Sequence, residues 1–144
     1  MNLYLDASVI VKLLIEEPGS DEAERIVATA EGVTTCLISY AEVRSALARK
    51  AREGGLLSDE HARVASAFEA DWDRYAASDM DSFIVRLAGD LAQRRALRAL
   101  DALHLASALF LQSSGNIPIA FLSADRRLQE AAEAEGLEVF TLSS

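Results

Sequence analysis

Short apolar runs alternate with helix-like segments along almost the whole chain, and this alternation restricts the fold more than any other feature. Strands are predicted at residues 2–6, 33–37, 117–122 and 138–142, and a further short strand fits residues 77–80. Helices are predicted at residues 7–17, 21–30, 39–53, 82–95, 101–112 and 125–135, with one more directly after Gly54-Gly55. Alternating strands and helices favour a parallel, doubly wound sheet. We therefore expect an α/β fold with helices on both faces of a central parallel sheet.

The two consecutive helices between residues 40 and 77 are expected to pair as a helical hairpin that protrudes from the sheet. The second helix carries an apolar stripe made of Val64, Phe68, Trp72 and Tyr75. Because this stripe has more aromatic surface than two helices usually need to pack together, the hairpin is predicted to serve as an interaction arm. The alternative is that the stripe belongs to the core.

Four acidic residues lie where a predicted strand ends or a predicted helix begins: Asp6, Glu42, Asp101 and Asp125. The carboxyl ends of parallel strands meet at one edge of a sheet, so these side chains should converge. At roughly 5 Å and an effective dielectric near 20, each carboxylate pair repels by about 3 kcal/mol, which a cation would offset. Oxygen ligands without Cys or His select a hard ion such as Mg²⁺ or Mn²⁺. The pattern predicts metal-assisted phosphodiester hydrolysis.

Each acid also has a purely structural interpretation. Ser39 and Glu42 have the S-x-x-E spacing of a capping box. The three aspartates are at helix starts, where Asp is favoured as a cap or in the first turn. Capping explains each acid singly, but it does not explain why all four would share the carboxyl edge of the sheet.

Three further side chains accompany the acids. Ser8 and Ser123 each lie two residues from an aspartate and could hold a metal-bound water or a carboxylate, although Ser is common in such turns. His104 follows Asp101 by one helical turn. It could reach the same edge, but on so apolar a helix it is expected to be packed and hydrogen-bonded.

Charge and length set limits on the function. The net charge of −9 argues against a nucleic-acid binder that relies on a global basic field, although a bound divalent ion would reverse the local sign at the acids. Basic residues are nevertheless grouped, and Arg44, Arg49 and Lys50 are candidates for RNA contacts; the alternative is a solvated helix face. The 144 residues fit a single domain, 1–144. A lone Cys36 and the absence of a signal-like or membrane-spanning run lead us to expect a cytoplasmic protein.

The residues around the four acids resemble a known family. Asp6 in LYLDASVIVKLL, Glu42 in SYAEVRSAL, Asp101 in LDALHLASAL and Asp125 in FLSADRRLQEAAEAEGL resemble the four acidic motifs of the PIN-domain ribonucleases. The D-A-L-H-L-A-S-A wording is most similar to VapC toxins of bacterial VapBC toxin–antitoxin systems, and the resemblance covers nearly the whole chain.

This resemblance implies a PIN-like three-layer fold and a metal-dependent endoribonuclease, the toxin component of a type II toxin–antitoxin module. It implies Mg²⁺ or Mn²⁺ held at Asp6, Asp101 and Asp125, with Glu42 completing the site. It also implies a homodimer, and inhibition by a cognate VapB-type antitoxin whose tail enters the cleft and often presents an Arg.

Other function classes lack residues that they need. A haloacid-dehalogenase-type phosphatase would need an acid at position 8, which is Ser, and a phospho-acceptor receiver would need a late Lys, whereas Lys12 and Lys50 are the only lysines. No G-K-[ST] segment exists for a P-loop. One alternative stays open: a catalytically inactive PIN-like interaction module that binds a basic partner tail. Metal-dependent RNA cleavage separates the two.

Overall fold

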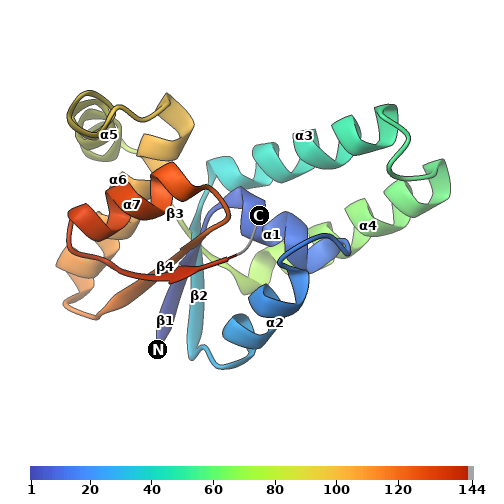
Figure 1. The fold of residues 1–144 in the computed structure, drawn as a ribbon, viewed down its shortest axis with the longest axis horizontal. Helices are drawn as coiled ribbons and strands as arrows, with labels where there is room; N and C mark the ends of the chain where they lie inside the picture. Colours follow the sequence, from blue (N-terminus) through green and yellow to red (C-terminus); the bar gives the residue numbers. More distant parts are fainter. Residues whose placement is uncertain (143–144) are drawn as a thin grey trace.

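A five-stranded parallel sheet forms the centre of the molecule in the computed structural model, which describes residues 1–142 (Figure 1). The strands are β1 (Asn2–Leu5), β2 (Gly32–Cys36), β3 (Ala76–Ser78), β4 (Ile119–Ser123) and β5 (Glu138–Thr141). Their order in the sheet is β3-β2-β1-β4-β5, with every neighbouring pair parallel. The chain therefore winds outward in both directions from β1, and the order of strands reverses between β1 and β4. Ligands of such sheets bind at the carboxyl edge beside this reversal.

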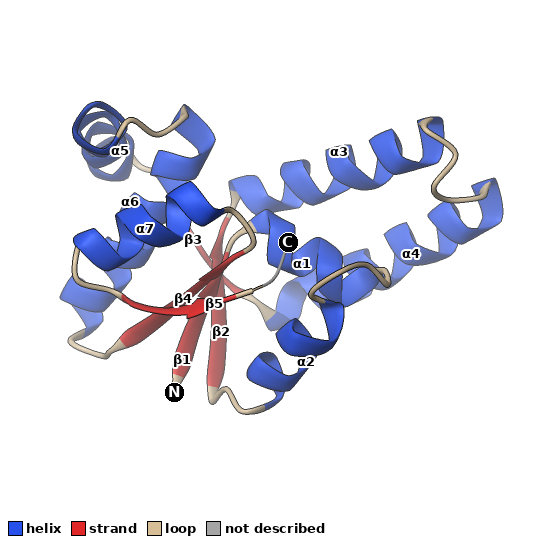
Figure 2. Ribbon diagram, in the orientation of Figure 1, coloured by secondary structure: helices blue, strands red, loops and turns tan. Residues whose placement is uncertain are grey.

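Helices cover both faces of the sheet (Figure 2). They are α1 (Ala7–Leu14), α2 (Ser20–Ala28), α3 (Ile38–Arg52), α4 (Ser58–Asp71), α5 (Ser82–Arg95), α6 (Ala99–Gly115) and α7 (Arg126–Ala134), with a 3₁₀ turn η1 (Trp72–Arg74). No helix within the described residues is long and apolar enough to cross a bilayer. The expected three-layer α/β fold, with its central parallel sheet, is confirmed.

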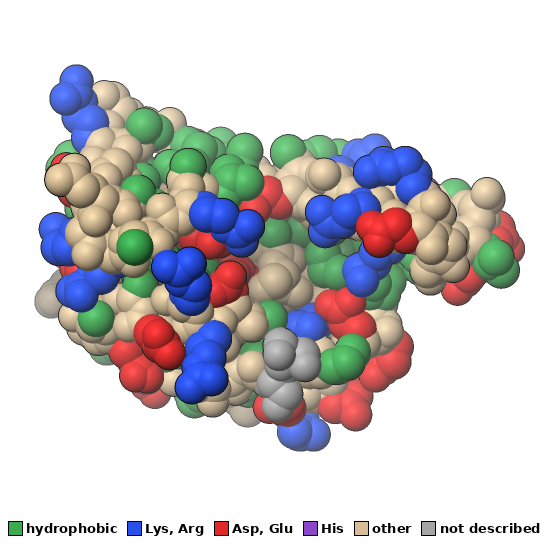
Figure 3. All heavy atoms as spheres, turned by 45° about the horizontal axis from the view of Figure 1, so that its top comes forward, with side chains coloured by type: hydrophobic (Ala, Val, Ile, Leu, Met, Phe, Trp, Pro, Cys, Tyr) green, Lys and Arg blue, Asp and Glu red, His purple; other side chains and the backbone are tan. Residues whose placement is uncertain are grey.

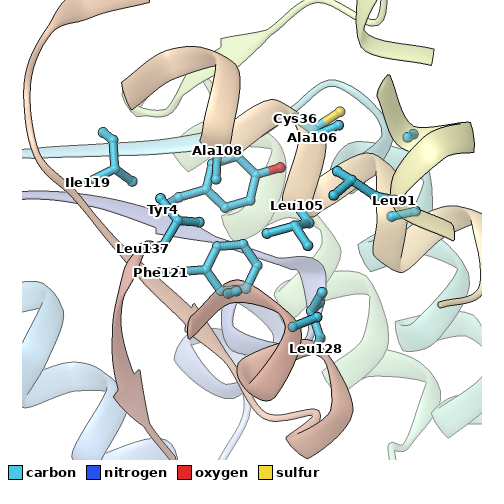
Figure 4. Packing of buried hydrophobic residues seen from close by; sticks show 14 of the residues in the cluster. Tyr4, Cys36, Leu91, Leu105, Ala106, Ala108, Ile119, Phe121, Leu128 and Leu137 are labelled. Carbon is cyan, nitrogen blue, oxygen red and sulfur yellow. The ribbon is translucent and has the colours of Figure 1, made fainter. Parts of the chain in front are cut away.

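Successive side chains along each strand point to opposite faces of the sheet, so the core consists of two clusters, one on each face. In β1, Leu3 and Leu5 face α1 to α4, whereas Tyr4 faces α5, α6 and α7. On that second face the ring of Tyr4 stacks on Phe121 of β4, with ring centroids 5.5 Å apart (Figure 4). Because β1 is buried on both faces, its carboxyl end, where Asp6 follows, has a fixed position.

The predicted helices and strands exist, and the differences are at their ends. The first helix stops at Leu14 rather than at residue 17. Ile15 has an extended backbone, and its carbonyl accepts a hydrogen bond from the Ser20 hydroxyl. The α6 helix continues to Gly115, where Asn116 terminates it with a positive φ of 50°. The following strand then begins at Ile119 instead of residue 117, since Pro118 has no N–H for the sheet.

The α3–α4 hairpin extends beyond the sheet, as expected (Figure 1). Its aromatic stripe, however, is not a free surface. Phe68 is fully buried, and the centroid of its ring lies 5.5 Å from that of Tyr40 and 5.6 Å from that of Trp72. The ring centroids of Tyr75 and Trp72 are 5.8 Å apart. These rings join the core cluster that includes α1. The stripe belongs to the core, which was the alternative, and it holds the base of the hairpin on the domain. It therefore gives no support to the predicted interaction arm.

Candidate active site

The four predicted acids come from four different segments at the carboxyl edge of the sheet. Asp6 directly follows β1, and Asp125 is the N-cap of α7 just after β4. Asp101 is in the first turn of α6, and Glu42 is in the second turn of α3, the helix that follows β2. The Asp6 N–H donates to the Leu122 carbonyl at 3.2 Å, which joins the ends of β1 and β4.

Asp6 is buried, and both of its carboxylate oxygens accept hydrogen bonds. Oδ1 accepts from the Ser8 hydroxyl at 2.6 Å and from the Val9 N–H at 3.3 Å, and Oδ2 accepts from the Ser123 hydroxyl at 2.5 Å. Burial raises the pKa of the Asp6 carboxyl, while nearby His104 and these hydrogen bonds act in the opposite direction. Asp6 is therefore a helix cap and, at the same time, a carboxylate at the carboxyl edge of the sheet.

The two predicted serines both hold this carboxylate. Ser123 also accepts from the Asp125 N–H at 3.0 Å, and Ser8 accepts from the Ala124 N–H at 3.1 Å. Of the two roles considered for these serines, hydrogen bonding to a carboxylate is present in the structure. The segments after β1 and after β4 are thereby linked by direct hydrogen bonds.

Asp101 is held much less tightly. It is half-buried, and its Oδ2 lies 3.5 Å from Nε of the exposed Arg98. Arg98, not Asp101, is the N-cap of α6, so the aspartate is a first-turn residue rather than a cap. Burial raises the pKa of the Asp101 carboxyl, and the negative charges of Asp125 and Asp6 raise it further. Asp125 and Asp6 are thus close enough to repel the Asp101 carboxylate.

The capping-box interpretation of Ser39 and Glu42 is wrong. The α3 helix begins at Ile38 after Leu37, which makes no side-chain capping bond. The Ser39 hydroxyl instead bonds to Thr35 Oγ1 at 2.7 Å, and Thr35 also donates to the Leu5 carbonyl at 2.7 Å. These buried hydroxyls connect the start of α3 to the end of β1.

Glu42 instead bonds to a buried histidine. Its Oε1 lies 2.7 Å from Nε2 of His104, and Nδ1 of His104 lies 2.8 Å from the Tyr4 hydroxyl. Burial raises the pKa of the Tyr4 phenol well above its ordinary value. His104 is packed and hydrogen-bonded, as expected, and it also reaches the site through Glu42.

Two adjoining hollows open above these acids. A groove of about 550 Å³ between α1, α3 and the start of α6 is lined by Ser8, Glu42, Arg49 and Arg98 among others. A hollow of about 200 Å³ is lined by Asp101, Asp125, Arg98 and Arg127 among others. Arg98 belongs to both. Figure 3 shows acidic side chains inside the recess and basic side chains on both of its sides.

Of the three candidate RNA contacts, one faces the groove. Arg49 lines it, about two helical turns after Glu42 and on nearly the same face of α3. Arg44 donates to the Tyr40 hydroxyl at 2.8 Å, and Nζ of Lys50 lies 3.0 Å from the Glu17 carboxylate. Arg98 lines both hollows, and Arg127 lines the smaller one.

The carboxylates suit a hard divalent cation. Within residues 1–142, no three His, Cys, Asp or Glu side chains already stand together as a complete ligand set. Mg²⁺ does not require one, because it keeps several waters and is commonly bound by one or two carboxylates together with substrate phosphates. The all-oxygen donors and the mutual repulsion at Asp101 fit such an ion.

Comparison with known proteins agrees with this geometry. The model of the PIN domain family matches residues 3–134. "Ribonuclease VapC45" of Mycobacterium tuberculosis is 36% identical over 137 residues, 95% of this chain and 93% of that protein. The solved structure of FitAcB from Neisseria gonorrhoeae matches with a TM-score of 0.67 and 20% identity, covering 96% of each chain. VapBC-5 of M. tuberculosis, a member of the VapBC family of toxin–antitoxin systems, matches at 0.60 and 19%, covering 99% of this chain and 98% of that one. The chain belongs to the PIN domain family, in the group of the VapC ribonucleases.

Proposed function

We propose that this protein is a metal-dependent endoribonuclease that hydrolyses RNA phosphodiester bonds as the toxin of a type II toxin–antitoxin module. The observation that carries the proposal is that Asp6, Glu42, Asp101 and Asp125 come from four separate segments at the carboxyl edge of the sheet. Glu42 lines one hollow, Asp101 and Asp125 line the second, and Arg98 lines both. The identity of 36% to a protein named a VapC ribonuclease, across 95% of this chain, supports the same activity.

Asp6, Asp101 and Asp125 would hold Mg²⁺ or Mn²⁺. When bound, such an ion neutralises charge on the scissile phosphate and lowers the pKa of a water molecule. Asp6 supplies a carboxylate whose position is fixed by Ser8 and Ser123, whereas Asp101 can adjust because its contact with Arg98 is exposed. Glu42, held by His104, orients the attacking water by accepting a hydrogen bond from it.

RNA phosphates would lie along the basic sides of the recess. Arg49 on α3 and Arg98 at the start of α6 both line the larger groove, as does Glu42. Arg44 and Lys50 would have to exchange their present partners, Tyr40 and Glu17, for phosphate. Binding is therefore local and basic even though the chain carries a net charge of −9.

The partners proposed are a VapB-type antitoxin and a second copy of the toxin. A structural match at a TM-score of 0.60 to a member of the VapBC toxin–antitoxin systems supports the first of these. An acidic recess suits a basic tail, whose cation would compete directly with the metal ion. The proposed place of action is the cytoplasm, where RNA is available.

Cleavage of an end-labelled RNA mixture by purified protein tests the proposal. Wild type should cut internally in Mn²⁺ or Mg²⁺ and stop in EDTA, and Asp101→Asn should abolish cutting. Asp73→Asn, on the exposed turn η1, is the matched control because it removes the same charge away from the recess and should cut like wild type. Wild type that binds a basic peptide but cleaves no RNA would favour the inactive interaction module. Equal cutting by Asp101→Asn would exclude this site as the nuclease.

A further inference from the structure

His104 connects the core of the protein to the carboxylate site. It lies on α6 beneath the recess and is fully buried, with Tyr4 of β1 at one ring nitrogen and Glu42 of α3 at the other. The three side chains come from three elements that are far apart in the sequence. Only Glu42 among them lines the groove.

The chemistry of the three groups fixes the direction of the bond to Glu42. A carboxylate only accepts, so Nε2 of His104 must carry the proton that it donates to Glu42. Where the ring carries no second proton, Nδ1 is an acceptor and the Tyr4 hydroxyl donates to it. Donation then runs from Tyr4 to His104 to Glu42.

The first member of this series cannot easily move. The ring of Tyr4 is fully buried, stacks on Phe121 with an angle of 4° between the rings, and meets the His104 ring edge-on at 5.8 Å. Figure 4 shows Tyr4 and Phe121 packed together inside the α5–α7 side of the core. A fixed phenol holds the histidine ring in place. The Glu42 side chain, by contrast, is partly exposed and would otherwise sample several rotamers.

We propose that His104 is a positioning residue that holds the Glu42 carboxylate in the groove for RNA cleavage, with its ring held in place by Tyr4. This inference rests on the proposed nuclease function. It differs from a role in packing alone, because packing needs the volume of the ring but not a proton on Nε2.

Two amide variants separate these roles. The amide nitrogen of Gln reaches close to the place of Nε2, so His104→Gln keeps a donor to Glu42. The shorter side chain of His104→Asn keeps an acceptor near Nδ1 for Tyr4 but loses the donor to Glu42. Both variants remove the ring, so urea unfolding should show similar stability losses. The kcat for RNA cleavage should fall about 10- to 100-fold in His104→Asn and remain near wild type in His104→Gln, with KM changed little in either. Equal rates in two equally stable variants would overturn the proposal.

Nitrogen NMR of the His104 ring provides a readout that needs no RNA. At a pH at which the ring carries one proton, metal-free wild type should have it on Nε2. Tyr4→Phe removes the hydrogen bond to Nδ1, so the Nδ1 signal should move toward that of a free lone pair while the proton stays on Nε2. A proton on Nδ1 in the wild type, or an unchanged Nδ1 signal in Tyr4→Phe, would overturn the proposal. If wild type cleaved no RNA, the nuclease function would fail, and the NMR result alone would then decide whether Glu42 is held in this way.

Discussion

Asp6 and Asp101 are both acids at the carboxyl edge of the same sheet, but they differ in burial and in hydrogen bonding. Asp6 is buried, and its two oxygens accept hydrogen bonds from Ser8, Val9 and Ser123. Asp101 is half-buried, and its ion pair is a 3.5 Å contact with the exposed Arg98. One carboxylate is therefore part of the folded framework, whereas the other has interactions that a ligand can replace at small cost. If the two carboxylates hold a metal ion as proposed, Asp6 would be a ligand in a fixed position and Asp101 a ligand that can adjust to what is bound.

The largest difference between the two acids should appear in the stability of metal-free protein. Asp6→Ala leaves the hydroxyls of Ser8 and Ser123 without their acceptor, and it should lower the free energy of unfolding by about 3 kcal/mol. Asp101→Ala removes repulsion together with an exposed pair, so the change should stay within about 1 kcal/mol. Urea unfolding in EDTA measures both. Similar losses in the two variants would contradict the division into a fixed and a responsive ligand.

Metal addition should favour the wild type over variants of the responsive acid. At 100 times its dissociation constant, Mn²⁺ should stabilise wild type by about 2.7 kcal/mol. Asp101→Asn should gain clearly less at the same concentration, because it has lost a charged ligand. Thermal melts with and without Mn²⁺ test this, with Asp73→Asn as the charge-matched control. The prediction fails if the metal shifts all three proteins equally.

Asp101 should contribute to the pH dependence of the free energy of unfolding. Its pKa is raised in the folded protein by burial and by the charges of Asp125 and Asp6. Between the unfolded and folded pKa values the folded state binds more protons, so stability falls as pH rises through this window. Without metal, Asp101→Asn should flatten this part of the curve and leave the contribution of Asp6, which has the same direction. A steeper curve in the variant would reverse the assigned sign.

The smallest effects on folding are expected at the basic sides of the recess. Arg98→Ala should change stability by less than about 1 kcal/mol. In a Glu42→Gln background, which prevents cutting, Arg49→Ala and Arg98→Ala should each reduce the salt dependence of RNA binding by about one unit of slope. Lys50→Ala provides the comparison, because Lys50 must leave Glu17 to reach a phosphate, so its loss should reduce the slope less than the loss of Arg49. A larger reduction in Lys50→Ala than in Arg49→Ala would place the RNA further along α3.

The sequence predicts much of this fold because its signals are local. The spacing at which apolar residues recur identifies the helices and strands. The alternation of these elements predicts the parallel sheet that brings Asp6 and Asp125 to one edge. The bonding partners could not be predicted in the same way. Ser39 and Glu42 have the spacing of a local cap, yet Thr35 and His104, brought close by the fold, are their partners.

One signal for the buried histidine was nevertheless present. His104 follows Asp101 by three residues, which places both on one face of α6, and Tyr4 precedes Asp6 by two, which places both on one face of β1. These two periods predict that Tyr4 and His104 approach one another below the acids. The aromatic stripe could not be assigned to the core from the sequence. Phe68 packs in one cluster with α1, which is far away in the sequence, and only the folded hairpin brings the two together.

Glu42 and Arg49 stand on one continuous helix, anchored at its start to the end of β1 through Thr35. Seven residues of α-helix place them about 10 Å apart along the axis and on nearly the same face. In the proposed nuclease, this spacing would set the distance between the bond that is cut and a phosphate bound by Arg49. The position of the cut along the RNA would then depend on two residues of α3. Insertion of a single residue between them would turn Arg49 about 100° away from the groove while Glu42 stayed in place.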